Sequence, residues 1–407
     1  MGLILIDNAR LCDPGATALT EGTLLVRGAV IEAVNPTYRP DDAERVDAGG
    51  LIVAPGIIDL GVFKTDKPAF HFGGITRAAL MPDTSPVLDD PGLVQHAGRA
   101  GKPDFWVHPL AAATRGLAGQ DLAELAMMRA AGARGVATGR QAIADAGVML
   151  RVMRYAAALD MVVVSHAEDR GLTAGAIATE GETATRLGLP AAPACAESIA
   201  IARDIALARI SGARLHIRIV STAEGFALIR SAKADGLPVT CGTSPAYLFL
   251  NDSAVSDFRT FARLSPPLRS EADRQATIAA VADGIVDVIT SSHDPRGPED
   301  KRLPFEDAAP GLAGAETLLA LSLNLVREGH IALPALMCLL AANPARLLGL
   351  DAGQLAPGAP ADLIFIDADT PWRVDARKMA AAAGNTPFDG LPVQGRVRRV
   401  MKGGVFY

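Results

Sequence analysis

The sequence lacks the features that mark membrane, exported or nucleic-acid-binding proteins. Aromatic residues make up only 4% of its 407 residues, and no apolar run is long enough to span a bilayer. Basic residues form no stripe, and the net charge of -6 argues against a nucleic acid as the partner. The first residues are strand-like and reach Asp7 at once, which is not the pattern of a signal peptide.

Cysteine is also scarce. Its four positions lie far apart, without the paired spacing of a disulfide framework or a zinc site; they are Cys12, Cys195, Cys241 and Cys338. We therefore expect reduced, mostly buried thiols and a cytoplasmic protein.

Hydrophobic residues are plentiful, at 49%, which is enough for a large buried core. Both ends of the chain read as short strands separated by Gly, Asp and Pro, for example "GTLLVRGAVIEAV" and "VQGRVRRVMKGGVFY". Two β-rich ends around a different middle predict one small β-sandwich domain formed by residues 1–54 and 355–407.

The middle of the chain, residues 55–354, alternates apolar strands with Ala-rich helices. Eight strands can be counted, among them "GIIDLGV", "DMVVVSHAED", "ARLHIRIVST" and "IVDVITSSHD". Eight such units predict a closed, TIM-type (β/α)8 barrel. An open doubly wound sheet is the alternative, but no G-x-G-x-x-G opens a helix at its start.

Polar residues gather where the predicted barrel strands end. These positions are His166, Glu168 and Asp169; Ser221 and Thr222; and Ser292, His293 and Asp294. In a barrel of this kind the carboxyl ends of the strands form the mouth, where sites are built.

Several motifs, in order along nearly the whole chain, carry a resemblance. They are "PGIIDL", "MPDTSPVLDD", "VVVSHAED", "LHIRIVST", "SPPLRSEADRQA", "DVITSSHDPRG", "NPARLLGL" and "GAPADLIFID". Together they resemble the dihydroorotase family of the amidohydrolase superfamily. The resemblance implies a barrel enzyme that hydrolyses or closes the cyclic amide of dihydroorotate, with one or two zinc ions and an aspartate that moves the proton.

The residues that the resemblance assigns to the metal centre are mostly replaced here. Gly61 and Phe63 stand in place of the first-strand His-x-His pair, and "ATGRQ", with Arg140, in place of the fourth-strand ligand. Ile219 stands for the sixth-strand histidine and Ser292 for the catalytic aspartate, so His166 alone is kept. Glycine, phenylalanine and isoleucine cannot bind a metal, so we expect no cofactor.

Positions that resemble the family's substrate-binding residues are also altered. Thr65 replaces the arginine that meets the substrate carboxylate, Asp83 replaces the asparagine of the MPNT segment, and Ser265 replaces that of NPPLR. A carboxylate at Asp83 would repel an anionic substrate.

A further departure lies after the first barrel strand. Only "AFHF", residues 69–72, stands where the family has a full helix, whereas a crossover helix with its loops needs about a dozen residues. The sequence thus predicts that the first barrel helix is missing. A bare flank would be covered by another chain or a second copy of this one.

Several polar residues have a structural interpretation. Asp59 is expected to support a strand end, His216 to be a core histidine, and His108 either to line the mouth or to pack. Lys64, Asp66 and Lys67 read as a solvated loop. "PPLRSEADR" reads as a helix start with charge pairs that include Arg269.

Three hypotheses remain. The first is a catalytically silent homologue that assembles with aspartate carbamoyltransferase, as some non-catalytic members resembling this chain do, or with itself. The second is an enzyme of different chemistry that uses His166, His293 and Asp294, with Asp83 and Lys64 near the mouth. The third is an active cyclic amide hydrolase whose zinc ligands stand at other positions than those matched above. Such ligands would come from the remaining histidines, which are His71, His96 and His330.

Overall fold

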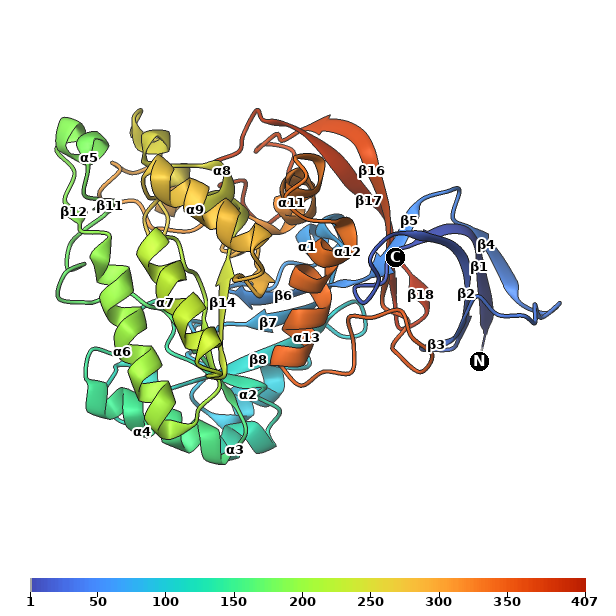
Figure 1. Ribbon diagram of the computed structural model, residues 1–407, viewed down its shortest axis with the longest axis horizontal. Helices are drawn as coiled ribbons and strands as arrows, with labels where there is room; N and C mark the ends of the chain where they lie inside the picture. Colours follow the sequence, from blue (N-terminus) through green and yellow to red (C-terminus); the bar gives the residue numbers. More distant parts are fainter. Residues whose placement is uncertain (1) are drawn as a thin grey trace.

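The computed structural model describes residues 2–407, and its centre is a barrel of eight parallel strands (Figure 1). The strands are β6 (Ile57–Val62), β7 (Ile75–Leu80), β8 (Trp106–Ala112), β9 (Gly135–Ala137), β10 (Val162–Ser165), β13 (Leu215–Ile217), β14 (Val239–Thr243) and β15 (Val288–Ile289). They pair in that order, each parallel to the next. The predicted TIM-type barrel is confirmed.

The barrel closes between β15 and β6 through a side chain. Asp59, fully buried on β6, accepts hydrogen bonds from the Thr290 hydroxyl (2.8 Å), the Ser291 backbone N–H (3.0 Å) and the Ser291 hydroxyl. The backbone N–H of Phe63 also donates to the carbonyl of His293, at 2.9 Å. Asp59 therefore supports the strand end, as its position in the sequence suggests.

Replacing Asp59 by asparagine should lower the free energy of unfolding by about 1–3 kcal/mol, because an amide nitrogen would face buried donors that need an acceptor. Urea unfolding would measure the loss. Asp160→Asn is the control, since the Asp160 side chain is 80% exposed. Equal midpoints for the two variants would show that other contacts hold β6 to β15.

Helices surround the barrel. The longer ones are α4 (Ala146–Ala158), α6 (Cys195–Ser211), α7 (Ala223–Ala234), α9 (Glu271–Ala282) and α11 (Leu318–Arg327), and shorter ones include α2 (Pro91–Ala97), α3 (Leu125–Ala130), α5 (Glu182–Leu187), α8 (Pro245–Phe249), α10 (Pro298–Lys301), α12 (Leu333–Met337) and α13 (Asn343–Leu347). Ser270 caps α9 by accepting from the Asp273 N–H, at the helix start expected from the sequence. Within residues 2–407 no helix is both long and apolar enough to cross a membrane.

The connection after β6 is shorter than a full barrel helix, but it is not bare. Residues Lys67–Gly73 form a short helix, α1, so the prediction that the first helix is missing needs correction. Asp66 caps its start and Pro68 stands in its first turn, two local signals that let seven residues form a helix. The buried Phe70 anchors α1 edge-on against Phe105.

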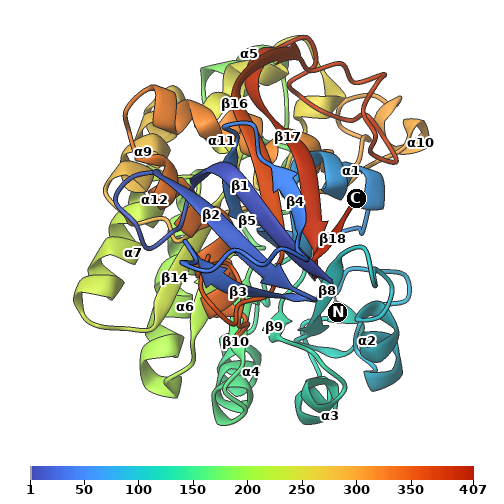
Figure 2. The same ribbon diagram turned by 90° about the vertical axis from the view of Figure 1, so that its right-hand side faces the viewer.

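Both ends of the chain form one eight-stranded sheet beside the barrel (Figure 2). Its strands are β1 (Leu3–Leu11), β2 (Thr20–Arg27), β3 (Val30–Val34), β4 (Glu44–Asp47), β5 (Ile52–Pro55), β16 (Leu363–Arg373), β17 (Pro392–Lys402) and β18 (Val405–Phe406). It branches at β1, which pairs first with β4 and then with β5. The antiparallel pairing of β5 with β16 joins the two ends, as predicted. The boundaries at residues 54 and 355 stay a prediction.

Buried charges fix this sheet to the barrel. Asp362, just before β16, accepts from Arg77 Nε on β7 and from Lys402 Nζ on β17, each at 2.8 Å. All three side chains are almost fully buried. A buried carboxylate with two cationic partners is satisfied, and the contact sets how the terminal sheet lies on the barrel.

Candidate functional site

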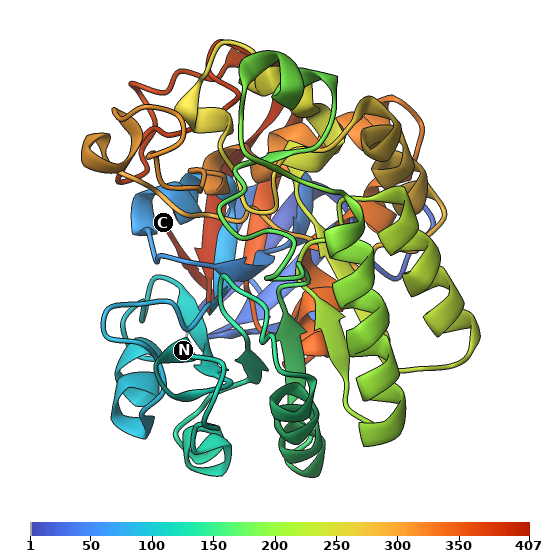
Figure 3. The ribbon, with the colours of Figure 1, turned by 90° about the vertical axis from the view of Figure 1, so that its left-hand side faces the viewer.

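A cavity of about 420 Å³ opens at the carboxyl ends of the barrel strands. Among its lining residues are Phe63, Arg140, His166, Arg218, Tyr247, Ser292 and Asp294, which follow or end β6, β9, β10, β13, β14 and β15. The long connection after β10 also lines it, through residues 173–177, and continues into β11 (Ala178–Thr179) and β12 (Ala191–Ala192). That connection is the green segment across the face seen in Figure 3.

An aromatic ring and two guanidinium groups occupy the part of the cavity next to β6. The Arg140 guanidinium lies 3.8 Å from the centroid of the Phe63 ring, and that of Arg218 lies 5.1 Å from it. Gly61 makes room for this arrangement, because a Cβ there would lie 3.3 Å from Arg218 Cδ. Its φ of 96° also favours glycine.

The Arg218 guanidinium is buried without a carboxylate partner. The residue is 2% exposed, and within residues 2–407 no carboxylate lies within 4.0 Å of its nitrogens. Its Nη2 lies 3.4 Å from His166 Nδ1, and its Nε has no hydrogen-bond partner. Burial lowers the pKa of Arg218 from its usual value.

Arg140, in contrast, is paired. Its Nη1 lies 2.6 Å from Asp294 Oδ2, and Arg296 Nε lies 3.2 Å from the same oxygen. The backbone N–H of Arg140 donates to Asp83 Oδ1 at 2.8 Å. Burial raises the pKa of Asp83, and its second oxygen has no partner. Asp294 thus lines the cavity, and Asp83 lies behind Arg140, outside the lining.

His166 has a defined place at the cavity wall. Its backbone N–H donates to the Thr138 hydroxyl at 3.0 Å, and its Nε2 lies 3.1 Å from Glu168 Oε2. Burial alone would raise the pKa of Glu168, but the hydrogen bonds and charges of His166 and Arg269 together hold it below its usual value. His166 therefore links Arg218 to a larger polar network.

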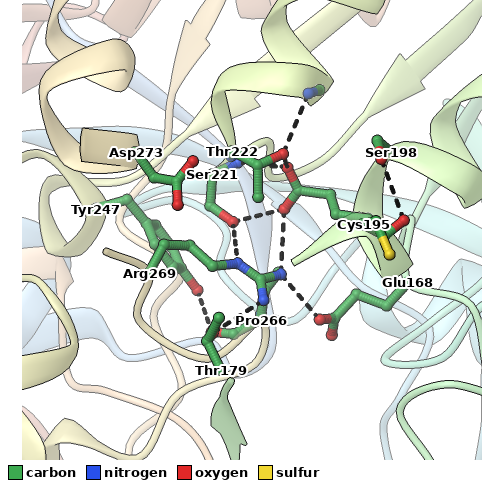
Figure 4. Close-up of polar contacts among 12 residues, drawn as sticks. Glu168, Thr179, Cys195, Ser198, Ser221, Thr222, Tyr247, Pro266, Arg269 and Asp273 are labelled. Carbon is green, nitrogen blue, oxygen red and sulfur yellow. Dashed lines mark hydrogen bonds and ion pairs between the residues drawn. The ribbon is translucent and has the colours of Figure 1, made fainter. Parts of the chain in front are cut away.

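Arg269 is the centre of that network, as Figure 4 shows. It donates to the hydroxyls of Ser221 and Thr179, both at 3.0 Å, and to Glu168 Oε1 at 3.1 Å. It is 3% exposed, so the expectation that it forms part of the charge pairs of a helix start is wrong. Its position before Ser270 leaves it outside α9, free to turn into the protein.

Glu197, on α6, completes the network with five hydrogen bonds, one of them from Arg269 Nη2 at 3.4 Å. Its carboxylate accepts from the backbone N–H groups of Ser221 and Thr222 (2.9 Å each) and from both of their hydroxyls (2.5 and 2.7 Å). A fully buried carboxylate with this many donors fixes the end of β13, the strand that leads to Arg218.

His293 does not share the cavity with His166 and Asp294. It is fully buried with its Nε2 3.5 Å from Asp66 Oδ2, and its Nδ1 accepts from the Ala315 N–H at 3.3 Å. The chain turns after β15, so consecutive residues point to opposite sides, His293 towards α1 and Asp294 towards the cavity. The trio of the second hypothesis is therefore not assembled.

Asp66 is not part of a solvated loop. Besides capping α1, it accepts from the Ala382 N–H at 2.6 Å and is 6% exposed. Lys64 and Lys67 are exposed, as expected. The sequence could not distinguish Asp66 from its neighbours, because its partners are distant along the chain.

The other histidines also lie away from the cavity. His216 is fully buried with Nδ1 2.9 Å from the Thr240 hydroxyl, and His108 is buried among cations that include Arg77. Burial lowers the pKa of both histidines to about 3. His71 and His96 lie on α1 and α2, and His330 follows α11. No regrouping of these histidines forms a cluster.

The donor set does not fit a divalent metal. Across residues 2–407 no three His, Cys, Asp or Glu side chains come together in a metal-binding arrangement. Of the positions matched to metal-centre residues, Ile219 packs in an apolar cluster with Tyr247, and the buried Ser292 hydroxyl has no partner. Two guanidinium groups next to Phe63 would repel a cation.

Arg218 is the residue that the sequence reading missed. It stands between Ile217 and Ile219 in "LHIRIVST", and a charge inside an apolar strand run is itself a signal. Glu197 was harder to identify from the sequence, because it lies in an ordinary helical stretch, "CAESIAIARDIALARIS".

Comparisons with known proteins agree with this architecture. A family model described as "Dihydro-orotase-like" matches residues 52–225. The chain is 39% identical to a dihydroorotase of Geobacter sp. (strain M21), over 99% of both chains, and 38% identical to one of Syntrophotalea carbinolica, over 97% of this chain and 96% of that one. An L-hydantoinase (dihydropyrimidinase) from Arthrobacter aurescens superimposes with a TM-score of 0.88 at 26% identity, covering 100% of this chain and 96% of that one. The chain therefore belongs to the dihydroorotase-like family of amidohydrolases.

Proposed function

We propose that this chain is a non-catalytic member of its family that serves as an assembly or regulatory partner of aspartate carbamoyltransferase. The observation that carries the proposal is the content of the barrel mouth. Where the resemblance places metal ligands, the chain has Gly61 and Phe63, and the Phe63 ring lies under the guanidinium groups of Arg140 and Arg218.

Hydrolysis of a cyclic amide in this family's manner needs a metal-activated water and a residue that moves the proton. Ser292 cannot replace a carboxylate in that role, because a hydroxyl is not ionised near neutral pH. Asp294 is held by Arg140 and Arg296, which both contact its Oδ2, so that oxygen is engaged in ion pairs. Core and turn motifs persist around a mouth that has lost these groups, which supports a role in binding.

Zinc analysis tests the catalytic side of the proposal. The purified chain is expected to hold far less than one zinc per chain and to leave dihydroorotate unchanged when zinc is added. The dihydroorotase of Geobacter sp. (strain M21), assayed in parallel, is the positive control. Stoichiometric zinc, or cleavage of dihydroorotate, would instead support an active cyclic amide hydrolase with an atypical site.

The α1 flank, defined as Lys67–Gly73 with Tyr407, is the surface that we assign to the partner. The Phe72 side chain on α1 is 59% exposed, and the Tyr407 ring, 43% exposed, lies 5.4 Å from that of His71. The short α1 leaves room here for another chain, either the transferase or a second copy.

Co-purification tests this assignment. The native chain should be retained by tagged aspartate carbamoyltransferase of the same organism, and Phe72→Ser should weaken the retention because it removes an exposed apolar contact. Met127→Ser is the matched control, since Met127 on α3 is also 59% exposed. If neither the native chain nor the Met127→Ser control is retained, the result argues against the partnership. If Phe72→Ser and Met127→Ser are retained equally, the interface does not include Phe72.

A further inference from the structure

Arg218 lacks the partner that its environment requires. The residue is 2% exposed and its Nε has no hydrogen-bond acceptor, while Nη2 reaches only His166 Nδ1, at 3.4 Å. Buried charges in proteins are normally paired, because an isolated one costs several kcal/mol or more. Arg218 lines the cavity, so a partner can reach it from there.

The nearby carboxylates make no ion pair with Arg218. Asp294 pairs with Arg140 and Arg296, and Glu168 pairs with His166 and Arg269. Asp83 accepts from the Arg140 backbone at 2.8 Å. None of these groups makes an ion pair with Arg218, so the place opposite its guanidinium remains open to an anion.

We propose that the cavity binds a small molecule through an oxyanion group, a carboxylate or a phosphate, held by Arg218 with Arg140 as a second cation. A planar guanidinium donates two parallel hydrogen bonds to either group. This place is next to Phe63, on the metal-centre side of the mouth, and its central residue, Arg218, is one to which the resemblance assigns no role. The proposal holds whether or not the transferase binds.

The rest of the ligand must fit a cavity whose walls carry apolar side chains as well as polar ones. The Phe63, Tyr247, Leu264 and Leu312 side chains line it, and the Tyr247 hydroxyl is turned away to donate to the Pro266 carbonyl at 2.6 Å. A volume of about 420 Å³ suits a metabolite rather than a polymer. The site therefore accepts a compact ligand with one anionic end and an apolar or ring-shaped body.

Binding to the purified full-length chain tests the proposal. Titration calorimetry and thermal unfolding would use inorganic phosphate, succinate and dihydroorotate, with chloride at equal ionic strength and uncharged uracil as references. At least one oxyanion should bind more tightly than chloride and raise the Tm. Tighter binding of phosphate or of the carboxylates would show which oxyanion group the site prefers. If none of the oxyanions binds more tightly than chloride, the proposal is overturned.

Substitution of Arg218 separates a ligand site from a structural role. Arg218→Met should lower the affinity for the oxyanion about 10- to 100-fold, which is the contribution of one hydrogen-bonded contact to a charged group. It should also raise the Tm of the ligand-free chain, because an unpaired buried charge is removed. Arg129→Met, at an exposed position on α3, makes the same charge change and should alter neither.

Two outcomes would contradict this reading of Arg218. Unchanged affinity in Arg218→Met would exclude it from the site, and a lower Tm without ligand would show that it stabilises the fold through His166. If that variant does not fold, Arg218→Lys is the alternative, because it keeps the charge without the planar guanidinium. Its oxyanion affinity should be lower than that of the native chain but should fall less than the 10- to 100-fold expected for Arg218→Met.

Discussion

Replacing Arg269 by methionine is expected to lower the free energy of unfolding by about 3–5 kcal/mol, because it removes one partner from a buried ionic network. Glu168, 7% exposed, would lose its guanidinium, and the Ser221 and Thr179 hydroxyls would lose a donor. Urea unfolding at neutral pH measures the loss. Arg274→Met is the control, because Arg274 pairs with the half-exposed Glu271 on α9 rather than with a buried carboxylate and should cost less than Arg269→Met.

A double substitution shows whether the loss comes from an unpaired carboxylate. Adding Glu168→Gln to Arg269→Met removes one of the two buried carboxylates that lose the guanidinium, so the pair should cost less than the sum of the single changes. Glu197 stays satisfied in both variants, because it accepts from the Ser221 and Thr222 N–H groups. Additive losses would mean that Arg269 acts through packing alone.

The same network has a defined pH dependence. The pKa of Glu168 is held below its usual value of 4.5 in the folded chain, so its contribution to stability is present above that pH and is lost as the pH falls further. Arg269→Met removes only part of this contribution, because His166 still lowers the pKa of Glu168 in the variant. The stability difference between native chain and variant should therefore shrink in acid.

The barrel could be predicted from the sequence because each of its strands has a recognisable local pattern. Each buried parallel strand is an apolar run followed by polar residues, as in "VVVSHAED", and the structure has all eight strands. The pairing of the two chain ends also followed from composition. A short helix such as α1 is harder to predict from the sequence, because seven residues show little periodicity. Its stability depends on the Asp66 cap and on the packing of Phe70.

The mouth could be predicted only in part. Strand ends placed His166 and Asp294 at the cavity, but the side to which a residue points changes once the chain leaves the strand, and His293 turned away. Glu197 and Arg269 meet across 72 positions of sequence, a contact that no local pattern contains. Arg218 was readable as a charge in an apolar run, yet its lack of a partner is visible only in three dimensions.

His216 should make the protein acid-sensitive through its burial. Its pKa is lowered from 6.5 to about 3 in the folded chain, chiefly by burial and then by the charges of Lys233 and Arg218. As the pH falls below about 6.5 the unfolded chain takes up this proton and the folded chain does not. Stability must therefore fall, by about 1.4 kcal/mol per pH unit, until the pH approaches 3.

Replacing His216 by glutamine isolates this effect from all other groups that titrate. At pH 7.5 the variant should be less stable by about 1 kcal/mol, through a weakened contact with the Thr240 hydroxyl. At pH 5 the native chain carries a proton penalty of about 2 kcal/mol that the variant escapes, so the order of stability should reverse. The same substitution at the exposed His96 is the control for replacing an imidazole at the surface. A His216 difference that does not change with pH would mean that the buried imidazole takes up its proton without unfolding, and that the strand β13 tolerates a charge next to Arg218.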